Sequence, residues 1–446
     1  MTKVIFSFDT EDYINPIGAD GILRSAKLLS QNGIKGCWCM VGEMASALKA
    51  WNRSDVINEL NDNHCIEFHS LSHSKHPCIN EYSDLCDFNT AKSIHIAREK
   101  YGIELLRSVF DKADPIAVVP PGSSHSYVAY YGYADMGIKL YSASRIFDQV
   151  KSRVLFCDNL PHLRYDRCLD TLLMRLDDEG IKETVERVKT KENYVFYHHP
   201  AMSYVKVFCD ELNFMAKNRE PQVLSPLWEK EKTEKFFENF EKLILALKSD
   251  PEIEFTTYAE FVDSLDKSQR TITKDTLKEI YPQLLENTFP VTTPDSFCIS
   301  DLYYACIELL KGNKSHQCGK VYGFLKEPFA LPSPVSVRAE DIKESAKYLP
   351  AEGFIPEFIY VNDKKIGPFD FLMAAMELLI SDKDTILISP RQWQIDLDQF
   401  PALRDTQLGK EWIHDPAQFN DDFLSNRLRL QSWTFRFEKN TPRFVL

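Results

Sequence analysis

The chain has 446 residues, more than one hydrophobic core usually supports, so we expect two domains. Its net charge of -13 and pI near 5.4 argue against nucleic acid as its main partner, because phosphate binding needs a basic surface. The sequence has no stretch of about eighteen apolar residues, so we expect no membrane insertion.

The N-terminus leads from Met1 directly into an apolar segment, without the basic region and cleavage site of a secretory signal. The eleven cysteines have no regular spacing, and the pair around Trp38 is a Cys-x-Cys within an apolar strand. We interpret most of them as small buried apolar side chains in a reducing compartment. Both features predict a cytoplasmic protein.

Strand-like and helix-like segments alternate over residues 1–265. Apolar strands are predicted first at 4–8 and 36–41, with a helical leucine pattern between them that stops at Asn32-Gly33. The alternation continues with a helix at 56–61 and strands at 65–68, 116–119, 140–142, 194–197 and 254–257. Because no glycine-rich phosphate loop is present, the pattern favours an α/β barrel of about seven strands over a nucleotide-binding sheet.

Chemically reactive side chains follow several of these strands. The acidic turn Asp9-Thr10-Glu11-Asp12 ends the first strand, and the motif His69-Ser70-Leu71-Ser72-His73 follows the third. Two histidines with this spacing can bind one ion, and we expect them on one helical turn, where residues i and i+4 face the same side. With one carboxylate they leave a coordination position for water, as in hydrolytic zinc sites.

These motifs resemble the polysaccharide deacetylase family, whose members are metal-dependent carbohydrate esterases with a deformed (β/α) barrel. The resemblance rests on the acidic turn at 7–12, the strand region 33–43, the H-[ST]-x-x-H motif at 69–73 and His199-Pro200 after an apolar strand, all in the family's order. It covers about residues 1–265. It implies a hydrolase that removes an acyl group from an amide, above all by N-deacetylation of a sugar or glycan.

The resemblance also implies roles for two catalytic residues. Asp9 matches the general base, which takes a proton from the attacking water. His199 matches the general acid, which protonates the leaving group, and an imidazole suits that role near neutral pH. His198 is the alternative acid, but it would point the opposite way on a strand.

For the metal, the resemblance implies one divalent ion, above all Zn2+, bound by His69, His73 and a carboxylate. Glu11 is the expected carboxylate, because alternate residues of an extended segment point the same way and Thr10 occupies the place of the family's usual aspartate. Asp12 is the alternative. If Asp12 is not the ligand, it contacts substrate or caps the following turn.

One position departs from the family. Its members commonly carry Arg-x-Pro, with an arginine that pairs with the base, where this chain has Val119 before Pro120-Pro121. Arg145 and Lys139, near the next strand, are candidate replacements. A backbone N–H near Gly122 is expected to contact the substrate oxyanion.

Residues 275–446, after a charged linker at 266–270, are richer in Pro and Trp and predict a mostly helical accessory domain. The segments 300–310 and 369–379 agree in register at Asp, Ala, Glu and two Leu. Either a small module is duplicated or two amphipathic helices are merely alike. The segment 354–368 is faintly similar to pseudomurein-binding-type repeats, which implies contact with a cell wall or glycan.

Two other functions stay open. A small non-sugar amide, as in allantoinase-type relatives, is an alternative substrate. A catalytically weak barrel that serves as a glycan-binding or scaffold protein is the other alternative, and the missing arginine at Val119 motivates it.

Overall fold

The computed structural model describes residues 1–83, 87–121, 126–143, 154–215, 217–286, 296–393, 426–427 and 429–438. These residues form two compact units. Within the described ranges, the first unit contains residues 1–143 and 162–264. The second contains residues 154–161 and the described residues from 265 onward. A short segment in the middle of the first unit's sequence therefore belongs to the second.

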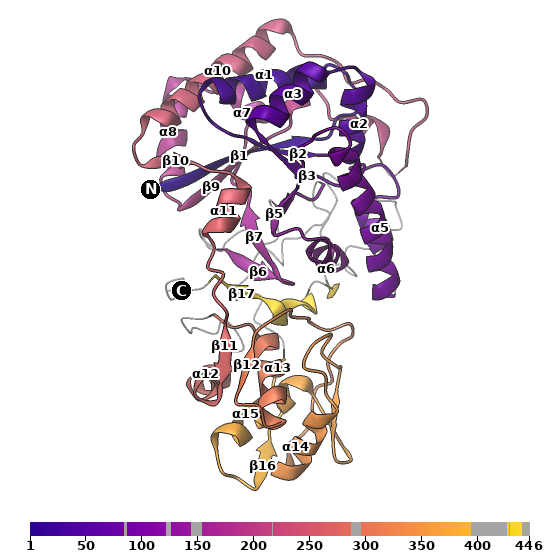
Figure 1. Cartoon of the computed structure of the whole chain (residues 1–446), viewed down its shortest axis with the longest axis vertical. Helices are drawn as coiled ribbons and strands as arrows, with labels where there is room; N and C mark the ends of the chain where they lie inside the picture. The colour runs from indigo at the N-terminus through magenta and orange to yellow at the C-terminus, as the bar shows by residue number, and fades with distance from the viewer. Residues whose placement is uncertain are drawn as a thin grey trace. The chain divides into compact units, whose positions relative to one another are not determined.

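The first unit is a mixed α/β structure, in which helices surround a curled half-barrel sheet (Figure 1). Strand β1 lies between β2 and β9, and the neighbouring strands pair in parallel. The predicted deformed (β/α) barrel is thus confirmed, as an open form. The strands are β1 (Thr2–Thr10), β2 (Cys37–Met40), β3 (Cys65–Phe68), β4 (Ala117–Val118), β5 (Leu140–Ala143), β7 (Leu160–Arg164), β8 (Arg167–Cys168), β9 (Asn193–His198) and β10 (Ile253–Phe255).

The central strand β1 is buried along its whole length except at Lys3, as expected for a parallel strand covered on both faces. Its aromatic side chains anchor the core: Phe8 stacks on Trp38 with ring centroids 4.1 Å apart, and Phe6 stacks on Phe196 at 5.5 Å. This packing fixes β1, and with it the acidic turn at its C-terminal end.

Helices connect these strands and bury one apolar stripe each against the sheet. In α1 the stripe includes Ile22, Ala26 and Leu29, and the chain leaves the helix through Gly33 with a φ of 72°. The helices are α1 (Gly18–Gln31), α2 (Gly42–Ala50), α3 (Ser54–Asn63), α4 (Ile79–Ser83), α5 (Phe88–Arg107), α6 (Tyr127–Asp135), α7 (Asp170–Leu173), α8 (Asp178–Val188), α9 (Cys209–Asn213), α10 (Lys230–Ser249) and α11 (Tyr258–Ser264), with a 3-10 turn at Pro200–Ser203.

The second unit contains two halves with the same order of elements. The first half is β11 (Thr271–Thr273), α12 (Lys274–Glu286), α13 (Ile299–Leu310) and β12 (Ser315–Gln317), and its two strands pair antiparallel. The second half has the same arrangement in β13 (Val335–Arg338), α14 (Ala339–Lys347), α15 (Pro368–Ile380) and β16 (Thr385–Ile388), with the hairpin β14 (Ile359–Val361) and β15 (Lys364–Ile366) added before α15.

The duplicated-module interpretation gains support from these halves. Helices α13 and α15 are the two segments that agree in sequence, and Asp301 and Asp370 occupy the same third position in them. Both aspartates are buried. Outside the halves, β6 (Leu155–Cys157) pairs antiparallel with β17 (Arg436–Phe437), beside a 3-10 turn at Ser432–Thr434. Nowhere in the described ranges is a helix long and apolar enough to cross a membrane.

Candidate active site

A pocket in the first unit lies at the C-terminal ends of its strands. It is lined by the five residues for which the sequence predicted a catalytic or metal-binding role: Asp9, Glu11, His69, His73 and His199. They come from the ends of β1, β3 and β9 and from the loops that follow. The other lining residues are Val119, Pro120, Ala143, Tyr165, Cys168, Tyr197, Phe208, Asp210 and Glu211.

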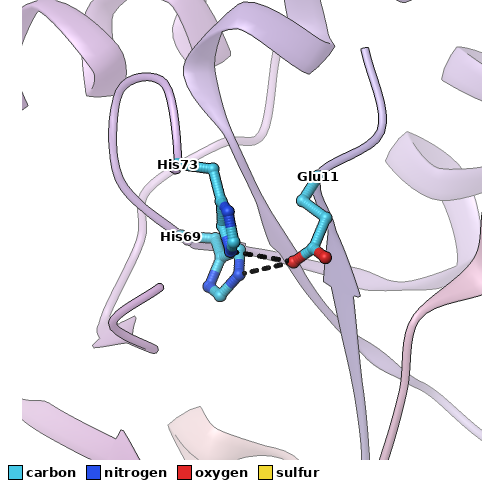
Figure 2. A group of neighbouring side chains, drawn as sticks. All are labelled: Glu11, His69 and His73. Carbon is cyan, nitrogen blue, oxygen red and sulfur yellow. Dashed lines mark hydrogen bonds and ion pairs between the residues drawn. The ribbon is translucent and has the colours of Figure 1, made fainter. Parts of the chain in front are cut away.

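Three buried side chains form a candidate metal centre (Figure 2). One oxygen of Glu11, Oε2, is 3.1 Å from Nε2 of His69 and 3.0 Å from Nε2 of His73. Ligand atoms about 2.0–2.2 Å from a shared ion lie roughly 3 Å apart, so the spacing suits one small cation.

The contacts of the two Nδ1 atoms test whether the site fits a cation. Nδ1 of His69 is 2.7 Å from the carbonyl oxygen of Val119, and Nδ1 of His73 forms an ion pair with Asp210. Both partners only accept, so both Nδ1 atoms carry protons, and Nε2 of a neutral ring then faces Glu11 as a second acceptor. A positive charge is needed between such acceptors, and a divalent ion on these N and O ligands provides it.

Without an ion, a proton on an imidazole provides this positive charge. Burial lowers the pKa of the His73 imidazole, but the charges of Asp210 and Glu11 outweigh burial and raise that pKa to about 10. Burial also opposes ionisation of Glu11, yet His73, His199 and His69 hold the pKa of Glu11 well below its usual range. Glu11 is therefore a carboxylate, as a ligand must be.

The histidine pair does not lie on a helix, so the predicted helical turn is wrong. Residues 69–73 form a loop in which Ser70 and His73 have positive φ values of 80° and 50°. Oγ of Ser70 accepts the N–H of His73 at 3.0 Å, and Oε2 of Glu99 on α5 accepts the N–H of Leu71 at 3.2 Å. This loop geometry, rather than helical periodicity, makes the imidazoles converge.

In the same pocket as the candidate metal centre, Asp9 faces His199. Oδ1 of Asp9 accepts the O–H of Tyr165 at 2.7 Å, and Oδ2 is 3.7 Å from Nε2 of His199. Nδ1 of His199 is 2.7 Å from Oδ2 of Asp170, whose Oδ1 accepts the His199 N–H at 3.0 Å. Burial lowers the pKa of His199, but Asp170 and Glu11 outweigh it and raise that pKa well above its usual range.

The neighbouring His198 lies on the other side of β9. It is fully buried, it is not part of the pocket lining, and its Nδ1 is 2.6 Å from Oδ1 of Asp170. Of the two histidines, His199 is therefore the one placed beside Asp9.

Of the other described candidates, neither Asp12 nor Lys139 lines this pocket. Oδ1 of Asp12 accepts the N–H groups of Ile14 and Asn15, and Oδ2 accepts the Asn15 amide at 2.7 Å. These bonds favour capping of the turn, and contact between Asp12 and substrate stays a prediction. Lys139 is exposed before β5, away from the strand end that reaches the pocket, so it does not replace the arginine. Gly122 and Arg145 lie outside the described residues.

Sequence reasoning missed three site residues: Tyr165, Asp170 and Asp210. Tyr165 and Asp170 flank the two-residue strand β8, and Asp210 lies on the five-residue helix α9. Elements this short show no hydrophobic periodicity, so no pattern in the sequence marks their neighbours as functional.

No family model matches this chain, and no curated protein does either. Solved structures do match in part. A 4-alpha-glucanotransferase from Thermococcus litoralis gives a TM-score of 0.42 at 10% identity over 59% of this chain, and the match spans only 40% of that enzyme.

Carbohydrate esterases are also among the matches. A family 4 carbohydrate esterase from Streptomyces lividans, in complex with acetate, gives a TM-score of 0.32 at 11% identity. The match covers 56% of this chain and 90% of the esterase chain. A putative polysaccharide deacetylase from Mycobacterium smegmatis gives a TM-score of 0.35 at 13% identity. The match covers 59% of this chain and 89% of that protein's chain.

A family 4 pseudoenzyme from Bacillus anthracis matches equally well, with a TM-score of 0.34 at 12% identity over 59% of this chain and 66% of its own. The two esterases and the pseudoenzyme thus match this chain at about the same TM-score and identity.

Proposed function

We propose that the first unit is a metal-dependent hydrolase that removes an acyl group from an amide, with N-deacetylation of a sugar or glycan as its reaction. The observation that carries the proposal is the pairing of two sites in one pocket. Glu11, His69 and His73 offer three converging acceptors, and beside them Asp9 and His199 face each other 3.7 Å apart.

Zn2+ fits the donor set of two imidazoles and one carboxylate, and such an ion polarises a carbonyl and makes water more acidic. Val119 and Asp210 hold the two imidazoles with Nε2 toward the pocket. A protonated His73 would have to give up its proton to bind the ion, so metal affinity is expected to fall in acid.

The proton transfers belong to Asp9 and His199. Oδ1 of Asp9 is bonded to Tyr165, and Oδ2 accepts a proton from the attacking water. His199 holds a proton on Nε2 because Asp170 stabilises the imidazolium through Nδ1. That proton goes to the leaving nitrogen when the acyl bond breaks.

The test compares metal content and turnover in full-length variants. His69→Ala and Glu11→Ala should lose the ion, while Asp9→Asn should keep it and lose roughly 100-fold or more in kcat on an acetamide or acetyl ester. Glu211→Gln, in the same pocket, is the control and should keep full metal. An intact ion in His69→Ala would overturn the metal assignment.

The same screen decides between the alternatives. Hydrolysis of small non-sugar amides alone would favour the allantoinase-type substrate, and bound metal without hydrolysis would favour the weak-barrel alternative that Val119 motivates. Contact of the second unit with a cell wall or glycan is a separate proposal, tested by retention of the full chain on insoluble glycans.

A further inference from the structure

We infer that Tyr165 orients the base Asp9, and so does the work of the arginine that Val119 replaces. This inference rests on the proposed function. The phenol donates to Oδ1 of Asp9 at 2.7 Å and is only 4% exposed. Among the described residues that line the pocket there is no Arg or Lys. The phenol of Tyr165 is the described side chain that donates a hydrogen bond to this carboxylate.

The direction of the hydrogen bonds follows from the acceptors. A carboxylate only accepts, so the single proton of the phenol goes to Asp9. The phenol oxygen then accepts from Ser7, whose Oγ lies 2.8 Å away. Ser7 and Asp9 are alternate residues of β1 and point to the same side of the strand, so one phenol reaches both.

The tyrosine ring itself is held firmly. Tyr165 follows β7, and its N–H donates to the carbonyl oxygen of Ala143 at the end of β5. Its ring stacks on that of Tyr197, with ring centroids 4.5 Å apart and an angle of 20° between the ring planes. The stacking and the backbone hydrogen bond fix the position from which the O–H donates.

This anchor selects the reactive oxygen of Asp9. The terminal torsion of an aspartate has a broad, roughly two-fold preference, so an unanchored carboxylate samples several orientations. With Oδ1 bonded to Tyr165, the oxygen left toward His199 is Oδ2, at 3.7 Å. Tyr165 is thus a positioning residue that acts through Asp9.

The test is Tyr165→Phe, which keeps the ring and its stacking and removes only the O–H. We expect kcat to fall about 10- to 100-fold, with KM within about twofold of wild type and full metal content. Ser7→Ala removes the other bond of the same phenol without touching Asp9, and kcat should stay within about threefold of wild type. Equal kcat in Tyr165→Phe and wild type would overturn the inference.

A double variant checks that Tyr165 acts through Asp9. In the Asp9→Asn background, Tyr165→Phe should cost little further activity, because the group it positions is already gone. Full additivity of the two losses would contradict the inference.

A crystal structure of Tyr165→Phe gives a readout that does not depend on turnover. We expect the Asp9 carboxylate to rotate away from its wild-type position, and an unmoved carboxylate would also overturn the inference. Wild-type protein that hydrolyses no ester or amide would overturn the proposed function instead, and the crystal structure would still decide the role of Tyr165.

Discussion

Glu67 on β3 carries a buried carboxyl group whose titration links stability to pH. Its Oε2 accepts the N–H groups of Ile116 and Ala117 at 2.9 and 2.8 Å, which ties β3 to the start of β4. The residue is 2% exposed, and burial raises the pKa of its carboxyl from 4.5 to about 8.

The sign of the effect follows from this upward shift. Between pH 4.5 and 8 the folded protein keeps the proton while the unfolded chain loses it. Stability from Glu67 is therefore fully present below pH 4.5 and is lost as the pH rises through about 8. A difference of about 3.5 pKa units corresponds to roughly 5 kcal/mol between the two ends of this range.

The variant Glu67→Gln removes the titration and keeps an oxygen that accepts both N–H groups. Its stability should be close to wild type near pH 5 and higher by up to about 5 kcal/mol at pH 9. Thermal unfolding from pH 5 to 9 measures this as a Tm difference that grows to roughly 10–20 °C. Glu254→Gln, at an exposed position on β10, is the control. A Tm difference that does not change with pH would refute the reasoning.

Two further predictions concern the site and the domains. Asp170→Asn should lower kcat at least about 10-fold with metal content unchanged, because an amide does not stabilise the His199 imidazolium. Turnover and elemental analysis measure this, and an unchanged kcat would contradict it. A chain cut after Ser268 loses β17, the partner of β6, so we expect size-exclusion chromatography to show that it aggregates. A soluble, metal-binding fragment would instead support an independent domain at residues 1–265.

Much of the first unit could be predicted because its long elements carry strong periodic patterns. Strand 65–68 was predicted with the bounds of β3, and the stop at Asn32-Gly33 lies directly after α1. The two-residue strand β4 lies within the predicted strand 116–119, but β7 and β8 were missed. No alternation can be read from the two residues of β8. The open edge of the half barrel also leaves no signature in a single sequence.

The site was predictable to the extent that its ligands lie next to one another in the chain. The spacing of His69 and His73 predicted that their imidazoles converge, which the structure shows, whereas their shared ion stays a prediction. The loop that carries them is held by Glu99 on α5, which their spacing did not indicate. Tyr165 bonds to Asp9 across 156 positions of sequence, and only the tertiary fold brings such a pair together.

The strand pairs of the second unit have an evolutionary consequence. In each half the first and last strands are hydrogen-bonded neighbours, as in the pairs Thr271 with Gln317 and Val335 with Ile388. A segment whose two ends meet can be copied or deleted in a gene while the flanking chain stays joined over a short gap. Relatives of this protein are therefore expected to differ in the number of such segments they carry.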